Sequence, residues 1–214
     1  MTYNIRLAGV GGQGIITAGT ILSEAARISG ENVIMSEIHG LSQRGGSVTV
    51  DVRIGECYGP IIPLDSCDLI VGLELMESFR SIEDLGKVTK ALISTEKLNP
   101  ISLSMHHREY PSLEALVENH GKDTIIFPVD AIEIAKAAGS PKSVNVVVIG
   151  IALGLHLIPL SISSVVGAMK NTFQDKIMGI NTKALELGLQ WARHMMNTEA
   201  SCLQMKVHQK LPRL

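Results

Sequence analysis

Two glycine-rich segments carry the residues best suited to chemistry in this sequence. The first contains Gly9, Gly11 and Gly14 in the pattern G-x-G-x-x-G. In such a motif the first glycine permits a tight turn, the second lets an anionic group approach the backbone, and the third lets a helix pack closely on a strand. The backbone amides of Gly11, Gly12, Gln13 and Gly14 are therefore candidates for binding an anion, such as a phosphate, or a neighbouring protein.

The second segment, residues 37–47, places three polar side chains beside a pair of glycines. Ligands in open α/β sheets bind at the carboxyl ends of strands, where this segment is expected to lie. Arg44 is suited to hold a phosphate or a carboxylate, His39 to hydrogen-bond a substrate or cofactor, and Gln43 to orient a polar group across an interface. Each also has a plain structural interpretation, as a surface arginine, a packed loop histidine and a surface amide.

A dinucleotide is an alternative ligand for the glycine loop. Glu37 lies at the end of the second expected strand, where dinucleotide-binding proteins keep the acid that binds the ribose. A stand-alone regulatory protein that binds a nicotinamide or flavin cofactor is therefore the alternative function. In the structural interpretation, the glycines only permit a tight turn between a strand and a helix.

The sequence shows no set of residues suited to nucleophilic catalysis or to metal binding. Cys57, Cys67 and Cys202 are widely spaced and include no CxxC pair, so we expect this chain alone to assemble neither an iron–sulfur cluster nor a structural zinc site. His106 and His107 are adjacent and would face opposite sides of a strand. There is no G-x-S-x-G motif, and we expect no catalytic residue in this chain alone.

Composition narrows the class of protein. Of the 214 residues, 45% are hydrophobic and 19% charged, which excludes an intrinsically disordered protein and favours one folded domain. The formal net charge is -2 and aromatic residues make up 3%, so binding of nucleic acid by a basic surface or by base stacking is not expected. The odd cysteine count and a start without a basic region before an apolar stretch predict a cytoplasmic protein.

Alternating strands and helices must position these segments. A strand over 4–8, the glycine loop and a helix over 15–29 form the first half of a βαβ unit. Ser112 and Asp130 are expected to cap two further helices. Five more strands are expected over 33–37, 48–54, 68–73, 91–94 and 124–129, the second of them half-exposed because its apolar and polar residues alternate. This order predicts an α/β fold.

The stretch 143–169 contains no charged residue and is long enough for a membrane helix. Pro159 interrupts it and Ser161 suits an N-cap, so two core helices are expected instead. A last helix is expected to begin at the N-cap Asn181 and to reach about residue 196. Residues 1–196 would then form one domain, and residues 197–214 a C-terminal tail of unknown role.

The segments GVGGQGIITAGTILSEAA and EIHGLSQRGGSV together closely resemble the gamma domain of the 2-oxoacid:ferredoxin oxidoreductases. Within that family they are most similar to the beta subunit of indolepyruvate ferredoxin oxidoreductases. The resemblance continues through DLIVGLE, VNVV, ALG and NTKALELG, and so extends over residues 4–192. It implies a three-layer, Rossmann-like domain whose sheet is mostly parallel or mixed, and it makes dinucleotide binding less favoured.

The resemblance also implies a function. Enzymes of this family decarboxylate a 2-oxoacid oxidatively with coenzyme A, forming an acyl-CoA and reduced ferredoxin, and this branch uses arylpyruvates. Thiamine diphosphate and 4Fe-4S clusters would be held by a larger partner subunit, so this chain would bind no cofactor alone and be inactive alone. Its two loops would cover the active site at the subunit interface and help to place coenzyme A. Isolated from its partner, the chain is expected to form a homodimer.

Overall fold

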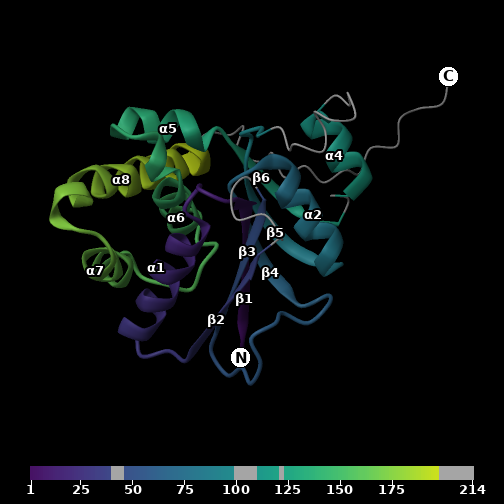
Figure 1. Cartoon of the computed structure of the whole chain (residues 1–214), viewed down its shortest axis with the longest axis horizontal. Helices are drawn as coiled ribbons and strands as arrows, with labels where there is room; N and C mark the ends of the chain where they lie inside the picture. The colour runs from purple at the N-terminus through teal and green to yellow at the C-terminus, as the bar shows by residue number, and fades with distance from the viewer. Residues whose placement is uncertain (40–45, 99–109, 121–122, 198–214) are drawn as a thin grey trace.

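A six-stranded sheet forms the centre of the molecule (Figure 1). The computed structural model describes residues 1–39, 46–98, 110–120 and 123–197. The strands, in chain order, are β1 (Tyr3–Val10), β2 (Val33–His39), β3 (Ser47–Ile54), β4 (Cys67–Gly72), β5 (Val88–Ser94) and β6 (Ile125–Val129). Their order across the sheet is β2-β3-β1-β4-β5-β6.

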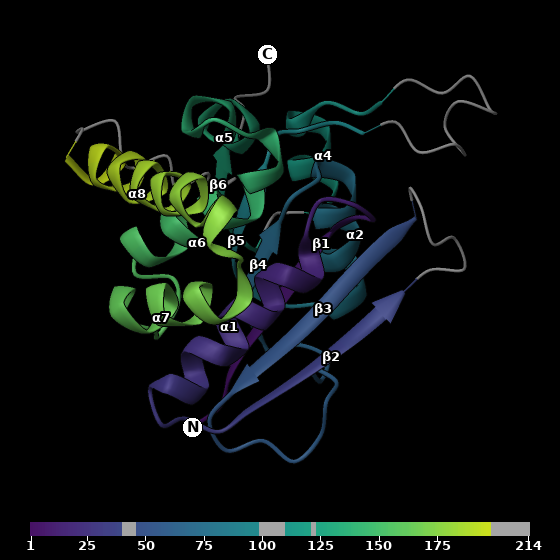
Figure 2. The same ribbon diagram turned by 60° about the vertical axis from the view of Figure 1, so that its left-hand side comes forward.

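The sheet combines a parallel half with an antiparallel half. β1, β4, β5 and β6 are parallel neighbours, whereas β3 is antiparallel to both β1 and β2. Figure 2 shows β3 beside β2 at the edge of the sheet. β2 and β3 form a hairpin, because neighbouring antiparallel strands need only a short connection. Within this hairpin it is β3, and not β2, that pairs with β1. The predicted α/β fold with a mostly parallel or mixed sheet is confirmed.

Helices cover both faces of the sheet, which gives the three layers. α1, α5, α6, α7 and α8 lie on one face, and α2 and α4 on the other (Figure 1). Their bounds are α1 Ile15–Ile28, α2 Leu75–Leu85, α4 Leu113–His120, α5 Ala131–Ala138, α6 Val144–Gly154, α7 Ile162–Thr172 and α8 Asp175–Asn197. Alternate residues of β4 and β5 contribute to two apolar cores; Leu69 and Val71 of β4 belong to the first and Ile70 to the second.

Local signals placed most of the helix starts correctly. Ser112, Asp130 and Ser161 each accept, through a side-chain oxygen, a hydrogen bond from the backbone N–H three residues later, at 3.2, 3.3 and 3.0 Å. The uncharged stretch forms two core helices, α6 and α7, as predicted. None of the helices among the described residues is long and apolar enough to cross a bilayer.

Two expectations about polar residues were wrong. Asn181 does not cap a helix: α8 begins six residues earlier, at Asp175, and Asn181 is buried within it, where its Oδ1 accepts a hydrogen bond from the Ser143 hydroxyl at 2.8 Å. β3 is not half-exposed at Asp51, which is fully buried and accepts hydrogen bonds from the Arg6 guanidinium at 2.6 and 2.8 Å. In both cases a distant polar partner makes burial of the polar side chain tolerable.

Candidate functional site

The glycine loop connects the end of β1 to the start of α1. Gly14 is the N-cap of α1 and has a φ of 78°, a left-handed conformation that favours glycine. A Cβ atom at Gly14 would lie 2.7 Å from the Asn145 Nδ2 of α6. The third glycine is therefore required by its backbone conformation and by a neighbouring helix, and not by packing of α1 on a strand, which the motif had predicted.

The four candidate amides of this loop divide into two pairs. The Gly11 N–H donates to the Gly46 carbonyl at 3.0 Å, and the Gln13 N–H donates to the Val10 carbonyl at 3.2 Å. The N–H groups of Gly12 and Gly14 have no hydrogen-bond partner among the described residues, and the same holds for the first three N–H groups of α1. These free donors face the region where a helix N-terminus attracts an anion.

A cavity of about 320 Å³ lies against these donors. It is lined by the glycine loop, by the first three residues of α1 and by Val48 of β3. Because it is at the carboxyl end of β1, it occupies the place where open α/β sheets bind their ligands. Its position and its N–H donors make it the candidate site for an anionic group.

The Gln13 side chain turns inward and holds the loop to the neighbouring strand ends. Its Oε1 accepts the Val10 N–H at 2.8 Å, while its Nε2 donates to the Leu73 carbonyl and to Glu96 Oε2, each at 2.9 Å. Gln13 therefore connects the glycine loop to the residues that follow β4 and β5. We infer that this side chain positions the loop backbone.

Glu96 is a site residue that the sequence reasoning missed. It follows β5 by two residues and is partly buried, which raises the pKa of its carboxyl; the nearby carboxylates of Glu74 and Asp130 act in the same direction, and the hydrogen bond from Gln13 opposes them. The sequence carried one signal for Glu96, which is its position just after a strand. Glu74, Glu96 and Asp130 each stand just after a strand, so their side chains come together at one edge of the sheet.

Glu74, two residues after β4, is the N-cap of α2. Its Oε2 accepts the N–H of Glu77 in the first turn of α2 at 2.9 Å. Its Oε1 accepts the Leu98 N–H at 3.1 Å and the hydroxyl of Tyr110. Burial, together with the Glu74 carboxylate, raises the pKa of Tyr110. Glu74 is fully buried, and these protein donors satisfy its carboxyl oxygens.

The second glycine-rich segment is joined to the first at Gly46. The hydrogen bond from Gly11 to Gly46 joins their backbones directly. His39 is the last residue of β2, where it pairs with Val48 of β3. The other candidates of this segment, Gln43 and Arg44, lie outside the described residues, as do Cys202 and the histidine pair at 106–107.

The sheet order disfavours the dinucleotide alternative. In a dinucleotide-binding fold, the strand that carries the ribose-binding acid is the neighbour of β1. Here Glu37 pairs with Val50 of β3, and Val50 pairs on its other side with Leu7 of β1. An antiparallel strand therefore separates Glu37 from the strand that leads into the glycine loop.

A second cavity, of about 780 Å³, lies at the amino ends of β5 and β6, at the other ends of the strands from the glycine loop. Its lining mixes acidic and basic residues, including Asp65, Lys87, His120 and Asp123. The Asp65 carboxylate accepts a hydrogen bond from the Lys87 N–H at 2.8 Å, which fixes the backbone just before β5. Volume alone would favour this cavity, but the free N–H donors and the strand ends place the candidate site at the glycine loop.

Comparison with known proteins identifies the family of this chain. The family model for pyruvate ferredoxin/flavodoxin oxidoreductases matches residues 4–191. The chain belongs to this family. It is 41% identical to the indolepyruvate oxidoreductase subunit IorB of Archaeoglobus fulgidus, over 88% of this chain and 94% of that subunit. It is 35% identical to the subunit of the same name from Methanothermobacter thermautotrophicus, over 88% of this chain and 96% of the relative.

Solved structures share the fold. The gamma subunit of a keto/oxoacid ferredoxin oxidoreductase from Geobacter sulfurreducens superposes with a TM-score of 0.66 at 24% identity, covering 90% of this chain and 99% of that subunit. A 2-oxoglutarate:ferredoxin oxidoreductase from Magnetococcus marinus, solved with 2-oxoglutarate, coenzyme A and succinyl-CoA bound, gives 0.71 at 19% identity, covering 90% of this chain and 31% of that one. The family membership expected from the two glycine-rich segments is confirmed.

Proposed function

We propose that this chain is the small, gamma-type subunit of an indolepyruvate or arylpyruvate:ferredoxin oxidoreductase. In that reaction the bond between the carboxylate and the oxo carbon breaks, carbon dioxide leaves, the acyl group is transferred to the thiol of coenzyme A, and two electrons pass to two ferredoxins. The observation that carries the proposal is the 41% identity to an indolepyruvate oxidoreductase subunit over nearly its whole length. Residues 1–196 would act as one domain, with no role assigned to residues 197–214.

Within this subunit, the glycine loop would bind an anionic group of coenzyme A or of the substrate at the subunit interface. Gly12 and Gly14 supply the free N–H donors, while Gly11 and the Gln13 side chain hold the loop in place. His39, Gln43 and Arg44 belong to the segment that the Gly11–Gly46 hydrogen bond joins to this loop. Arg44 would meet a phosphate or carboxylate of the bound ligand.

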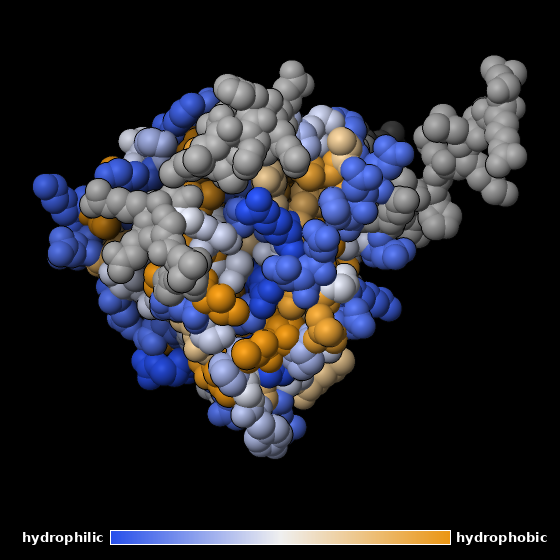
Figure 3. Space-filling model, turned by 45° about the vertical axis from the view of Figure 1, so that its right-hand side comes forward, coloured by the Kyte–Doolittle hydropathy of each residue, from blue (hydrophilic) through white to orange (hydrophobic). Residues whose placement is uncertain are grey.

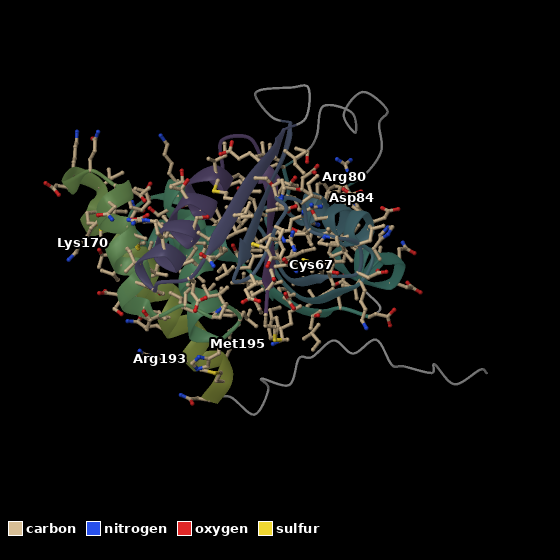
Figure 4. All side chains as sticks on the ribbon, turned by 90° about the horizontal axis from the view of Figure 1, so that it is seen from below. Cys67, Arg80, Asp84, Lys170, Arg193 and Met195 are labelled. Atoms are coloured by element: carbon tan, nitrogen blue, oxygen red, sulfur yellow. The ribbon has the colours of Figure 1, made fainter. Side chains whose placement is uncertain are left out.

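Thiamine diphosphate and the 4Fe-4S clusters would be held by a larger partner subunit. Among the described residues, no group of three or more His, Cys, Asp or Glu side chains could hold a metal ion. Cys67 is the first residue of β4 (Figure 4), and burial raises the pKa of its thiol to about 12, which suits packing and not a thiolate ligand. The two described cysteines, Cys57 and Cys67, are free thiols, in keeping with a cytoplasmic location.

Exposed apolar side chains support association with other subunits. Tyr58, Ile61 and Leu64 are 99%, 64% and 70% exposed. Figure 3 shows hydrophobic side chains gathered in the lower half of one face of the molecule. Without its partner, the chain would cover apolar surface by pairing with itself. We expect a homodimer in light scattering at micromolar concentration, and a monodisperse monomer would contradict this.

The function is tested by reconstitution. Proteins captured with this chain from its native source should include a large subunit with thiamine diphosphate and ferredoxin-type cysteine motifs. The two subunits together should reduce ferredoxin or a viologen dye when given an arylpyruvate and coenzyme A. The isolated chain should not, and activity of the isolated chain would refute the proposal. Calorimetry with NAD(H), NADP(H) and FAD tests the alternative, because tight binding would favour the regulatory protein.

The role of Arg44 has its own test. In the assembled enzyme, Arg44→Lys should lower kcat/KM about tenfold or more, because a charge-assisted hydrogen bond is worth about 1.5 to 3 kcal/mol and lysine lacks the bidentate fork. Gel filtration should show that the complex still assembles. An Arg44→Lys complex with full turnover at low coenzyme A and low arylpyruvate would end the assignment.

A further inference from the structure

We propose that two copies of this chain pair through the outer edge of β2, antiparallel and with Ser36 of each copy at the twofold axis, so that one sheet runs through both. β2 is the last strand of the sheet, and among the described strands it pairs with β3 alone. Figure 2 shows no other described helix or strand on its outer side. The inference deepens the proposed pairing of the chain with itself, and rests on it, by naming the surface that pairs.

The outer edge of β2 presents backbone groups that no described strand uses. The Gly55 N–H donates to the Asn32 carbonyl at 2.8 Å, one residue before β2 begins. Hydrogen-bonded and non-bonded residue pairs alternate along an antiparallel ladder, so the backbone groups of Ser36 point to β3, whereas those of Val33 and Met35 point outward. β2 can therefore accept a further strand on this side.

The two edges of the sheet differ in how they resist such pairing. Edge strands that stay single in natural proteins usually carry a lysine, a proline or a bulge. β6, at the other edge, contains Pro128, which has no N–H to donate. β2 reads VIMSEIH, with one charged residue, Glu37, and neither a lysine nor a proline. The sequence of β2 therefore favours pairing with another strand.

The residues of β2 match a second copy of the same strand. In the antiparallel register centred on Ser36, Ile34 of one copy lies opposite Ile38 of the other, once on each side of the axis. Both isoleucines lie on the face opposite to α1, against which Met35 packs, and Ile38 is 46% exposed. Glu37 lies opposite Met35 and not opposite a second Glu37, so like charges do not meet. A second copy of this chain is thus the partner that fits.

The loop that joins β3 to β4 gives an independent reason for this partner. It crosses the same face of the sheet, where the Arg53 guanidinium donates to the Ile61 carbonyl at 3.1 Å. The Ser36 hydroxyl donates to the Pro60 carbonyl at 3.0 Å, which holds the loop beside the residue through which the axis would pass. The exposed side chains of Tyr58 and Ile61 on each loop would then be covered by the loop of the second copy.

A disulfide across the axis tests the pairing. Residues opposite each other at a non-hydrogen-bonded position have Cα atoms about 4.5 Å apart, which a disulfide can span. Ser36→Cys in the full chain should therefore give a disulfide-linked dimer on mild oxidation, detected by non-reducing electrophoresis and located by mass spectrometry. Thr49→Cys is the matched control, because Thr49 lies on the same face but one strand further from the axis, and it should not link. The unchanged chain shows what its own cysteines contribute.

Analytical ultracentrifugation measures the strength of the pairing. Ile38→Lys places an ammonium group in the apolar cross-strand pair, twice in each dimer, and should raise the dissociation constant of the dimer about tenfold or more. Ile162→Lys is the control, because Ile162 is 45% exposed but belongs to α7, and it should leave the constant unchanged. Circular dichroism checks that both variants fold, and Ser36→Cys remains decisive if Ile38→Lys does not.

Each outcome decides between alternatives. A dimer that Ser36→Cys links and that Ile38→Lys weakens supports the pairing. A dimer without the link at position 36, or one that Ile38→Lys weakens no more than Ile162→Lys does, uses another surface and overturns it, as does a monodisperse monomer. Turnover of the reconstituted enzyme is measured separately with arylpyruvate. Turnover with a chain that does not pair through β2 rejects this inference alone, whereas pairing without turnover in any reconstitution rejects the proposed oxidoreductase function.

Discussion

Two glutamates lie at the carboxyl ends of neighbouring strands and have different surroundings. Glu74 follows β4 and Glu96 follows β5, and these strands are parallel neighbours. Glu74 is fully buried and accepts hydrogen bonds from two backbone N–H groups and the Tyr110 hydroxyl. Glu96 is partly exposed, and within the described part of the chain its carboxylate accepts a single hydrogen bond, from the Gln13 side chain.

The difference shows that residues at the same position after a strand can either stabilise the fold or hold a loop of the candidate site. Protein donors surround the carboxyl group of Glu74, so its hydrogen bonds stabilise the start of α2 and the chain around residue 98. Among the described residues, the Glu96 carboxylate accepts one hydrogen bond, and its donor, Gln13, belongs to the glycine loop. We therefore expect changes at Glu74 to alter the free energy of unfolding, and changes at Glu96 to alter the loop with little effect on stability.

The largest effect is expected for Glu74→Ala. The substitution leaves buried donors unsatisfied and removes the cap of α2, so the free energy of unfolding should fall by about 3 kcal/mol. Urea denaturation followed by circular dichroism measures this. Asp130→Ala is the control, because Asp130 caps α5 from an exposed position, and it should cost only about 1 kcal/mol. Equal losses in the two variants would show that the buried network adds nothing.

A smaller, local effect is expected for Glu96→Ala. Without its bond to Glu96, the Gln13 side chain should leave its place more often, and the Val10 N–H, which donates to Gln13, should exchange with solvent about tenfold faster. Amide hydrogen exchange measured by NMR gives this rate. Glu133→Ala, which removes an exposed acid bonded to Lys136, should leave Val10 unchanged. Unchanged exchange at Val10 in Glu96→Ala would mean that Glu96 does not position the loop.

The smallest effect concerns pH. Burial raises the pKa of Glu96 above its ordinary value of 4.5, so the folded chain holds this proton more firmly than the unfolded chain. Its contribution to stability is thus complete below pH 4.5 and is lost as pH rises through the raised pKa. Glu96→Gln, which stays neutral, should become slightly more stable relative to the unchanged chain between pH 4.5 and neutrality. Urea denaturation curves at several pH values measure the difference, and parallel pH profiles would contradict it.

Sequence alone determined the features that depend on short stretches of chain. The α/β class, the strand-loop-helix around the glycines and the caps at Ser112, Asp130 and Ser161 were all predicted correctly. The two glycine-rich segments also identified the family. Such features are readable because hydrophobic periodicity, capping side chains and glycine spacing act within a few residues of one another.

Only the tertiary structure decided which distant residues meet. Insertion of β3 between β1 and β2 removed Glu37 from the glycine loop, and the ion pair with Arg6 buried Asp51. Glu96 meets Gln13 across 83 residues of sequence, and Asn181 meets Ser143 across 38. Long-range pairing follows from strand order and helix packing, which bring side chains together without leaving a periodic or local pattern in the residues themselves.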